Sequence, residues 1–244
     1  MAEIRQSRVE EMERKKVTFR ISRFRPGTSD PKRFQIVEVE ITQTMTVLDC
    51  LDQIRTRQDP TLMYGRSCHH ASCGTCACRV NGTEMLACTT RVWDLEAGAV
   101  TLEPLANVDP IGDLALDMNP FFKALSKDWH HVRASEGEQS ISTARADGSP
   151  ERFEACIECG ACYSACPVIR KNPWFIGPAV LAALHREYDK TKQKEVLAPA
   201  AGEFGASLCE RAINCSRVCP AGVYPARRIS DIRRLLEAYP AEKC

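Results

Sequence analysis

Two cysteine-rich runs in the second half of the chain have the spacing of metal-cluster ligands. The run from Cys156 to Pro167 reads C-x2-C-x2-C-x3-C-P, in which three close thiolates hold one iron–sulfur cluster and the fourth serves another. A second run, from Cys209 to Pro220, repeats this spacing, except that Ala212 stands where its second cysteine should be. Because each run gives its last cysteine to the other cluster, the two predicted clusters have unequal numbers of ligands.

The two predicted clusters therefore differ in type. The first is a [4Fe-4S] cluster with the four ligands Cys156, Cys159, Cys162 and Cys219. The second has only three thiolates, Cys166, Cys209 and Cys215. A cubane with three thiolates can lose its unligated iron, so Ala212 predicts a [3Fe-4S] cluster at this site. The alternative is a pair of structural zinc sites, which also use C-x2-C spacing, although zinc sites rarely show interleaved four-cysteine runs closed by proline.

A third group of cysteines, in the first half of the chain, has the plant-type two-iron spacing C-x4-C-x2-C followed by a distant fourth cysteine. The predicted [2Fe-2S] ligands are Cys68, Cys73, Cys76 and Cys88. Gly74 suits a tight loop whose backbone amides point at the sulfurs, because glycine has no Cβ to block the approach. His69 and His70 suggest a Rieske centre as an alternative, but that centre needs histidines in place of two cysteines, and all four are present.

The three remaining cysteines are interpreted as non-ligands. Cys50 falls within a helical pattern and is expected to be a small buried hydrophobe. Cys78 lies beside the two-iron loop and is expected to pack, and Cys244 at the terminus is expected to be exposed.

The elements around the first cysteine group predict a β-grasp domain. Residues 17–24 and 34–41 alternate apolar and polar side chains and are separated by turn residues, as expected for a two-stranded hairpin. Thr46 can cap a helix whose apolar positions, Val47, Leu48, Leu51 and Ile54, recur at helical spacing. Asn81-Gly82 predicts a type I′ turn that returns the chain to present Cys88.

The rest of the chain predicts helices, so the expected fold class is α+β. The expected divisions are a charged leader at residues 1–16, a β-grasp plant-type [2Fe-2S] ferredoxin domain at 17–106, and an all-α bacterial-type two-cluster ferredoxin domain at 107–244. The pattern turns helical from Gly112, a helix is expected over residues 178–190, and an amphipathic helix closes the chain around Ile229 and Leu236.

Composition narrows the function classes. The chain has 244 residues, 14 cysteines, and 33 basic against 32 acidic residues, so no charge excess suggests a nucleic-acid partner. The leader carries charges of both signs and lacks the apolar core of a secretory signal. We therefore expect the protein to stay in a reducing compartment, where cysteines are more often metal ligands than disulfide partners. No apolar run reaches the length of a membrane span. No nucleotide fingerprint or nucleophilic triad is present, so no catalytic residue is assigned, and a flavin on another chain is the expected electron source.

Over residues 15–240 the chain resembles the iron–sulfur subunit of succinate dehydrogenase and fumarate reductase. The matching features are the three cysteine groups, Asn172-Pro173, and the segment Phe175 to Pro178. The resemblance implies a flavoprotein partner carrying FAD, clusters ordered two-iron, four-iron and three-iron, and a membrane anchor with a quinone site. It also implies a peripheral position on the cytoplasmic face of a bacterial membrane.

The sequence departs from this family where a quinone is expected to bind. Pro167 matches, but Arg170 and Lys171 occupy the positions of a common tryptophan pair, and Glu210 occupies a position that is often histidine. Pro167, Lys171 and Glu210 are the candidate quinone-side residues. Either the pocket is altered, or the basic pair simply faces lipid headgroups. The departure leaves open the same module serving another flavoprotein dehydrogenase or a non-quinone acceptor, and a non-redox module with structural clusters is a further alternative.

Overall fold

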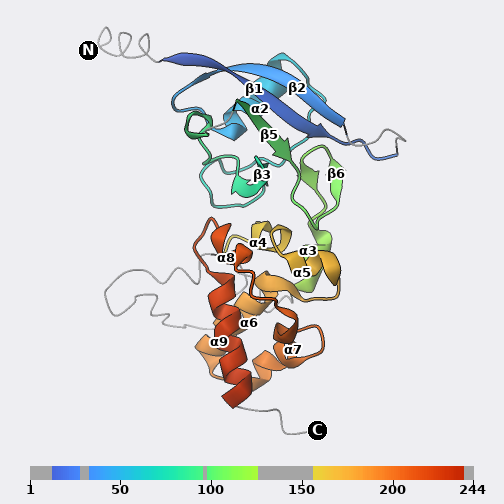
Figure 1. Ribbon diagram of the computed structural model, residues 1–244, viewed down its shortest axis with the longest axis vertical. Helices are drawn as coiled ribbons and strands as arrows, with labels where there is room; N and C mark the ends of the chain where they lie inside the picture. The colour runs from blue at the N-terminus through green and yellow to red at the C-terminus, as the bar shows by residue number, and fades with distance from the viewer. Residues whose placement is uncertain (1–12, 28–32, 96–97, 126–155, 239–244) are drawn as a thin grey trace, which may run out of the picture. The chain divides into compact units, whose positions relative to one another are not determined.

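The computed structural model describes residues 13–27, 33–95, 98–125 and 156–238 (Figure 1). The chain divides into two compact units, Met1–Leu105 with Asp109–Asp117, and Ala106–Val108 with Met118–Cys244. The first is built on a mixed sheet and the second on helices, so the expected α+β class is confirmed. The predicted leader lies largely outside the described residues, as does Cys244.

The sheet of the first unit has the strand order β2-β1-β5-β3-β4. Strands β1 (Arg14–Arg23) and β2 (Arg33–Thr42) form the predicted antiparallel hairpin, and β5 (Ala99–Glu103) runs parallel to β1. Strands β3 (Ala77–Val80) and β4 (Thr83–Leu86) form a second hairpin. Its turn residues, Asn81 and Gly82, have φ of 50° and 83°, which confirms the predicted turn with two positive φ angles.

Helix α2 (Val47–Arg57) packs its apolar face into the core of this unit. Thr46 begins it with a capping box, in which the Thr46 hydroxyl accepts the Asp49 N–H and the Asp49 carboxylate accepts the Thr46 N–H. The cap and the buried face confirm the sequence prediction, with the buried residues Val47, Leu48, Leu51 and Ile54. Cys50 and Cys78 are also buried, as expected.

A buried ion-pair network ties three segments of the first unit together. Arg23, at the end of β1, places Nη1 2.6 Å from Asp59 Oδ2 and Nε 2.9 Å from Asp113 Oδ1. The Asp113 carboxylate also accepts the backbone N–H groups of Phe24 and Met63, each at 2.9 Å. Because Arg23 and Asp113 are both nearly inaccessible to solvent, each charge depends on the other for compensation.

The network explains why the helix predicted from Gly112 begins later. Residues 110–116 form the short strands β6 (Pro110–Gly112) and β7 (Ala115–Leu116), with Asp113 at φ 43° in the turn between them. The first helix after this point is α3 (Asn119–Ala124). The sequence prediction placed the domain boundary between residues 106 and 107. In the structure, residues 106–108 group with the helical unit and residues 109–117 with the sheet unit.

The helical unit is organised by two long helices, α6 (Gly177–Thr191) and α9 (Pro225–Ala238), which pack along each other (Figure 1). Shorter elements surround them: α4 (Ala161–Ser164), α5 (Pro167–Lys171), η4 (Lys194–Leu197), α7 (Ala198–Ala201), η5 (Ala206–Leu208) and α8 (Asn214–Arg217). Leu181, Leu184 and Ile232 lie at the centre of the core. In the described part of the chain, no helix is both long enough and apolar enough to cross a bilayer.

Candidate iron–sulfur cluster sites

The loop that carries Cys68 is folded so that its backbone amides converge on the Cys68 sulfur. The N–H groups of His70, Ser72 and Cys73 donate to Cys68 Sγ at 3.5, 3.3 and 3.4 Å. The hydrogen bond from His70 is the main reason why the pKa of the Cys68 thiol falls to about 5. Hydrogen bonds to the charged form favour it, so this loop is prepared for a thiolate.

Unusual backbone angles produce this convergence. His69 and Ala71 both lie in the left-handed region, with φ of 62° and 61°, and Gly74 follows at 71°. Non-glycine residues adopt this region at a cost, and such residues concentrate at functional sites. His70 is occupied within the loop, since Nε2 lies 3.2 Å from Ser72 Oγ and Nδ1 contacts the Cys68 carbonyl oxygen.

Gly65 supports the same loop, and sequence reasoning did not identify it. A Cβ at Gly65 would collide with the carbonyl oxygen of Thr75, so only glycine allows the two backbones to approach this closely. Thr75 in turn places Oγ1 3.2 Å from Cys73 Sγ. No spacing rule connects Gly65 to the cysteine motif, because the contact depends on how the chain folds back.

The β3–β4 hairpin brings the remaining two cysteines to the loop. Cys76 directly precedes β3 and Cys88 follows β4, with the Ala87 N–H donating to the Cys76 carbonyl at 3.1 Å. Burial raises the pKa of Cys76 to about 12, and the charges of Cys88 and Cys73 add to the effect. The structure thus brings the cysteines of this motif into mutual electrostatic range.

In the helical unit, one cavity is lined by the cysteines that cross-pairing assigns to the four-iron cluster. Cys156, Cys159, Cys162 and Cys219 all contribute to its wall, which we call the first cavity. Burial raises the pKa of Cys159 to about 12 and that of Cys162 well above its usual value. Such thiols stay protonated at neutral pH unless a metal ion, which deprotonates a coordinating thiol outright, compensates the charge.

A second cavity is lined by the other three cysteines, Cys166, Cys209 and Cys215, and by Ala212. Burial raises the pKa of Cys215 to about 11, and the neighbouring charges of Cys166 and Cys209 contribute. Ala212 lines this cavity and occupies, in the repeated spacing, the position of Cys159, which lines the first. The donor sets of both cavities therefore fit iron–sulfur clusters, with three thiolates in the second.

Single-ion sites look different from these cavities. Within the described residues, no group of three or more His, Cys, Asp or Glu side chains has the arrangement needed to hold a single metal ion. A cluster requires its thiolates to be spread around several irons.

Two of the three candidate quinone-side residues line the second cavity. Pro167 and Glu210 line it, and Pro167 also begins helix α5. Lys171, at the end of α5, places Nζ 2.9 and 3.1 Å from the two carboxylate oxygens of Glu210. Two of the three positions where the sequence departs from its resemblance, Lys171 and Glu210, are thus partners in one ion pair. Trp174 takes no part in this ion pair. Its side chain is 74% exposed and packs against Phe204.

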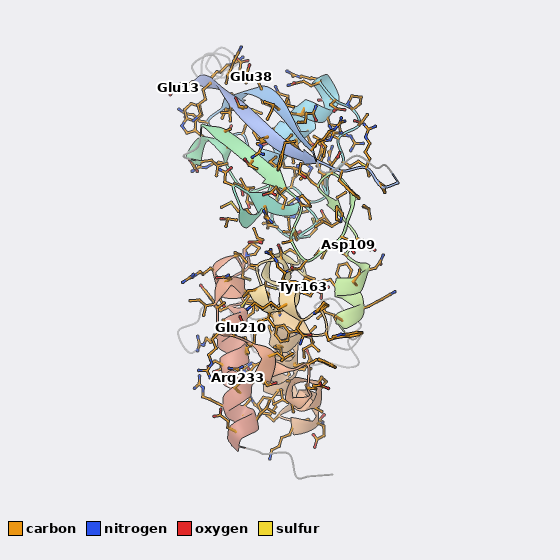
Figure 2. The ribbon with its side chains drawn as sticks, turned by 45° about the vertical axis from the view of Figure 1, so that its right-hand side comes forward. Glu13, Glu38, Asp109, Tyr163, Glu210 and Arg233 are labelled. Atoms are coloured by element: carbon orange, nitrogen blue, oxygen red, sulfur yellow. The ribbon has the colours of Figure 1, made fainter. Side chains whose placement is uncertain are left out.

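Asn107 is another residue that the sequence did not single out. Its side-chain amide lies 3.1, 3.0 and 3.2 Å from the carbonyl oxygens of Tyr163, Ser164 and Cys166. These carbonyls belong to the stretch between Cys162, which lines the first cavity, and Cys166, which lines the second. Asn107 therefore fixes the segment that joins the two cavities, and Figure 2 labels Tyr163 within it.

Comparisons with known proteins agree with this division of sites. Residues 18–123 match the model of a 2Fe-2S iron–sulfur cluster binding domain, and residues 152–223 match that of a 4Fe-4S dicluster domain. The fumarate reductase iron–sulfur subunit of Mycobacterium tuberculosis is 34% identical over 240 residues, covering 93% of this chain and 96% of that protein. The corresponding subunit of Escherichia coli is 33% identical, covering 90% and 92%. The chain belongs to the fumarate reductase iron–sulfur subunit family.

The fold has a counterpart among solved structures. A chain of the Mycobacterium smegmatis Sdh1 complex in the apo form superposes with a TM-score of 0.76, covering 94% of this chain and all of that one. Its sequence identity of 22% supports a shared fold. The relatedness to this family and the two-domain ferredoxin architecture expected from the sequence are therefore confirmed.

Proposed function

We propose that the chain is the electron-transfer subunit of a succinate:quinone oxidoreductase. The observation that carries this proposal is the presence of three separate cysteine groups, two of them lining neighbouring cavities in one helical unit. When bound, the clusters supply one-electron carriers between a flavin and a quinone. The chain's own residues provide thiolates, hydrogen bonds to sulfur and dry surroundings, which together set cluster potential.

The proposed ligand sets follow the cavities and the two-iron loop. For [2Fe-2S] they are Cys68, Cys73, Cys76 and Cys88. For [4Fe-4S] they are Cys156, Cys159, Cys162 and Cys219, and for [3Fe-4S] they are Cys166, Cys209 and Cys215. The three-iron assignment rests on Ala212, which supplies no donor to the second cavity.

The proposed partners are a flavoprotein subunit carrying FAD and one or more membrane-anchor subunits that bind quinone. Relatives of this chain are named as subunits, and its described residues contain no helix suited to crossing a membrane. In this arrangement the chain is peripheral, held by the anchor on the cytoplasmic face of a bacterial membrane. When bound in its partner subunit, the flavin would supply the oxidation of succinate or the reduction of fumarate.

Pro167, Lys171 and Glu210 are the proposed quinone-side residues. Pro167 and Glu210 line the second cavity, and Lys171 is paired with Glu210. The exposed Lys171 ammonium can donate a hydrogen bond to a quinone carbonyl, and the Glu210 carboxylate can accept one from a quinol hydroxyl and exchange protons with water. The ion pair also motivates the alternative of a different acceptor, because it replaces aromatic and imidazole groups with charges. Two measurements on the purified complex separate quinone from another acceptor: the rate at which it reduces quinones and the rate at which it reduces soluble acceptors. Rapid reduction of a soluble acceptor without reduction of quinones would support the alternative.

Low-temperature EPR of the anaerobically purified complex tests the proposal. We expect a three-iron signal in the oxidised protein, followed on stepwise reduction by two-iron and then four-iron signals. Parallel metal analysis is expected to find iron and no stoichiometric zinc. Two intact cubanes in the wild-type protein would contradict the three-iron assignment, and stoichiometric zinc without paramagnetic iron would overturn the electron-transfer function.

A further inference from the structure

Arg233, on helix α9, is hydrogen-bonded to the backbone immediately before and at Cys209. Its Nε and Nη2 donate to the Ala206 carbonyl at 2.9 and 2.8 Å, and Nη2 also donates to the carbonyls of Ser207 and Cys209 at 3.0 and 2.8 Å. Figure 2 labels Arg233 and Glu210 in the helical unit. One guanidinium thus holds the segment that carries a lining cysteine of the second cavity.

The local backbone explains why a cation is needed there. The short helix η5 (Ala206–Leu208) ends directly before Cys209, whose N–H donates to the Ala206 carbonyl at 3.2 Å. The carbonyls of the last turn of a helix have further acceptor capacity that the helix itself does not use. A guanidinium presents several donors in a rigid fork and forms charge-assisted bonds to such carbonyls. The segment is also constrained from behind, because a Cβ at Gly205 would collide with the Ala200 carbonyl oxygen.

Helix α9 also holds the arm that carries Cys215. At its start, the Ala226 N–H donates to Ser216 Oγ at 2.9 Å, next to Cys215. Two of the three cysteines that line the second cavity are therefore fixed from the same helix. By contrast, the Lys171–Glu210 pair reaches the Cys209 arm only through exposed side chains, and exposed ion pairs contribute little to stability.

We infer that Arg233 is the positioning residue for Cys209, and hence for the cluster in the second cavity; this inference rests on the proposed function. A site with three thiolates has no fourth ligand to compensate when one is displaced. Freeing the carbonyls of Ala206, Ser207 and Cys209 lets Cys209 move, whereas the first cavity receives none of its cysteines from this arm. Arg233 therefore acts on one cluster and leaves the other intact.

The test compares Arg233→Gln and Arg233→Lys with Arg234→Gln in the purified complex. Arg234 is the matched control: it is the next residue of α9, is 73% exposed and is 2.7 Å from Asp231. The measurement is the rate at which each EPR signal is lost during incubation with an iron chelator. For Arg233→Gln we expect the signal of the second-cavity cluster to disappear about tenfold faster, the lower end of the effect of losing a partner that orients a metal ligand.

The four-iron and two-iron signals of Arg233→Gln, and every signal of Arg234→Gln, are expected to keep their wild-type rates. For Arg233→Lys we expect a rate of loss of the second-cavity signal between those of wild type and Arg233→Gln, since lysine keeps the charge but lacks the forked guanidinium. Equal loss of both helical-unit clusters would show that Arg233 merely stabilises the unit, and wild-type rates in Arg233→Gln would show that it positions nothing; either result overturns the inference. Because the variants are compared with wild type whatever cluster the second cavity holds, a cubane there would contradict the proposed three-iron centre without deciding this test.

Discussion

The first and second cavities are built on the same backbone conformation but offer different ligands. Helix α4 begins after Gly160 and α8 begins after Ile213, the equivalent positions of the two cysteine runs. In both copies, the carbonyl of that residue accepts the N–H groups three and four residues later. The repeat in the sequence is therefore a repeat in structure, and Ala212 changes the ligand count without disturbing the loop.

The two copies differ in the backbone strain that this conformation imposes. Gly160 has φ 77° and Ile213 has φ 55°, both in the left-handed region. Glycine adopts this region freely, whereas a β-branched residue there is a genuine outlier. The second loop keeps the shape of the first at a cost in backbone strain, and its isoleucine is 46% exposed at the cavity wall.

The surroundings of the cavities differ as well. Beside the first, the positive charge of the buried Arg186 acts on Cys156 against the negative charge of Glu158. Glu210, which lines the second, is paired with Lys171, and both side chains are exposed. Net charge and solvent exposure are among the factors that set cluster potential, so we expect the two clusters to differ in potential beyond the difference in iron content.

The largest expected effect comes from giving the first cavity the ligand set of the second. Cys159→Ala removes one of its four thiolates, so we expect the four-iron signal to disappear and the three-iron signal to increase about twofold. EPR and iron analysis of the purified complex measure this. Cys78→Ala, which removes a buried cysteine outside both cavities, should leave the helical-unit signals unchanged. A four-iron signal of wild-type intensity in Cys159→Ala would exclude Cys159 as a ligand.

The reverse exchange is Ala212→Cys, which offers the second cavity a fourth thiolate. We expect the three-iron signal to diminish and a second four-iron signal to appear on reduction. Ala212→Val adds bulk without a sulfur donor and should not produce a second cubane. An unchanged three-iron signal in Ala212→Cys would mean that the position of residue 212, rather than its side chain, prevents ligation.

Exchanging the left-handed residues tests the strain difference. Gly160→Ile should destabilise the first loop by roughly 1–3 kcal/mol, the usual cost of such strained backbone. Ile213→Gly should remove comparable strain from the second loop, partly offset by lost packing. The temperature at which each cluster signal is lost measures both effects. If Gly160→Ile leaves the four-iron signal as heat-resistant as in wild type, the proposed strain is absent.

The smallest expected effect on stability comes from the exposed ion pair. Lys171→Gln and Glu210→Gln should each change the unfolding free energy by less than about 1 kcal/mol, because both side chains are solvated. If the pair serves the quinone, the same variants raise KM for quinone while leaving reduction of a soluble dye unchanged. Arg170→Gln, in the same helix, is the control. Equal loss of quinone and dye activity would remove the pair from the quinone side.

Much of the fold was predictable because local rules govern it. Alternating strands, the Thr46 cap and the Asn81-Gly82 turn each depend on residues close in sequence, and the structure confirms all three. The hairpin at residues 110–116 was missed because its apolar spacing resembles that of a helix. Its shape instead follows from the contact of Asp113 with Arg23, which lies ninety positions earlier in the chain.

The cluster sites also combine features that depend on residues close in sequence with features that depend on distant contacts. The cysteines that the spacing assigns to one cluster line the same cavity, since a short motif restricts where its thiols can lie, and the ligand sets themselves stay a prediction. The residues that support the cysteines were not predictable in this way. Gly65, Asn107 and Arg233 act through backbone atoms of distant residues, so their own types carry no trace of their partners.

The buried pairing of Arg23 with Asp113 also has a consequence for the order of biosynthesis. A ribosome that has released only residues 1–105 presents every strand of the five-stranded sheet, yet Arg23 still lacks one of its two carboxylates. Residues 106–108 group with the helical unit, and residues 109–117, which include Asp113, belong again to the sheet unit. The sheet unit is therefore complete only after residues 109–117 have been synthesised. A gene fragment cut at the apparent domain border should therefore yield an aggregation-prone product, whereas one extended through Asp117 should yield a soluble one.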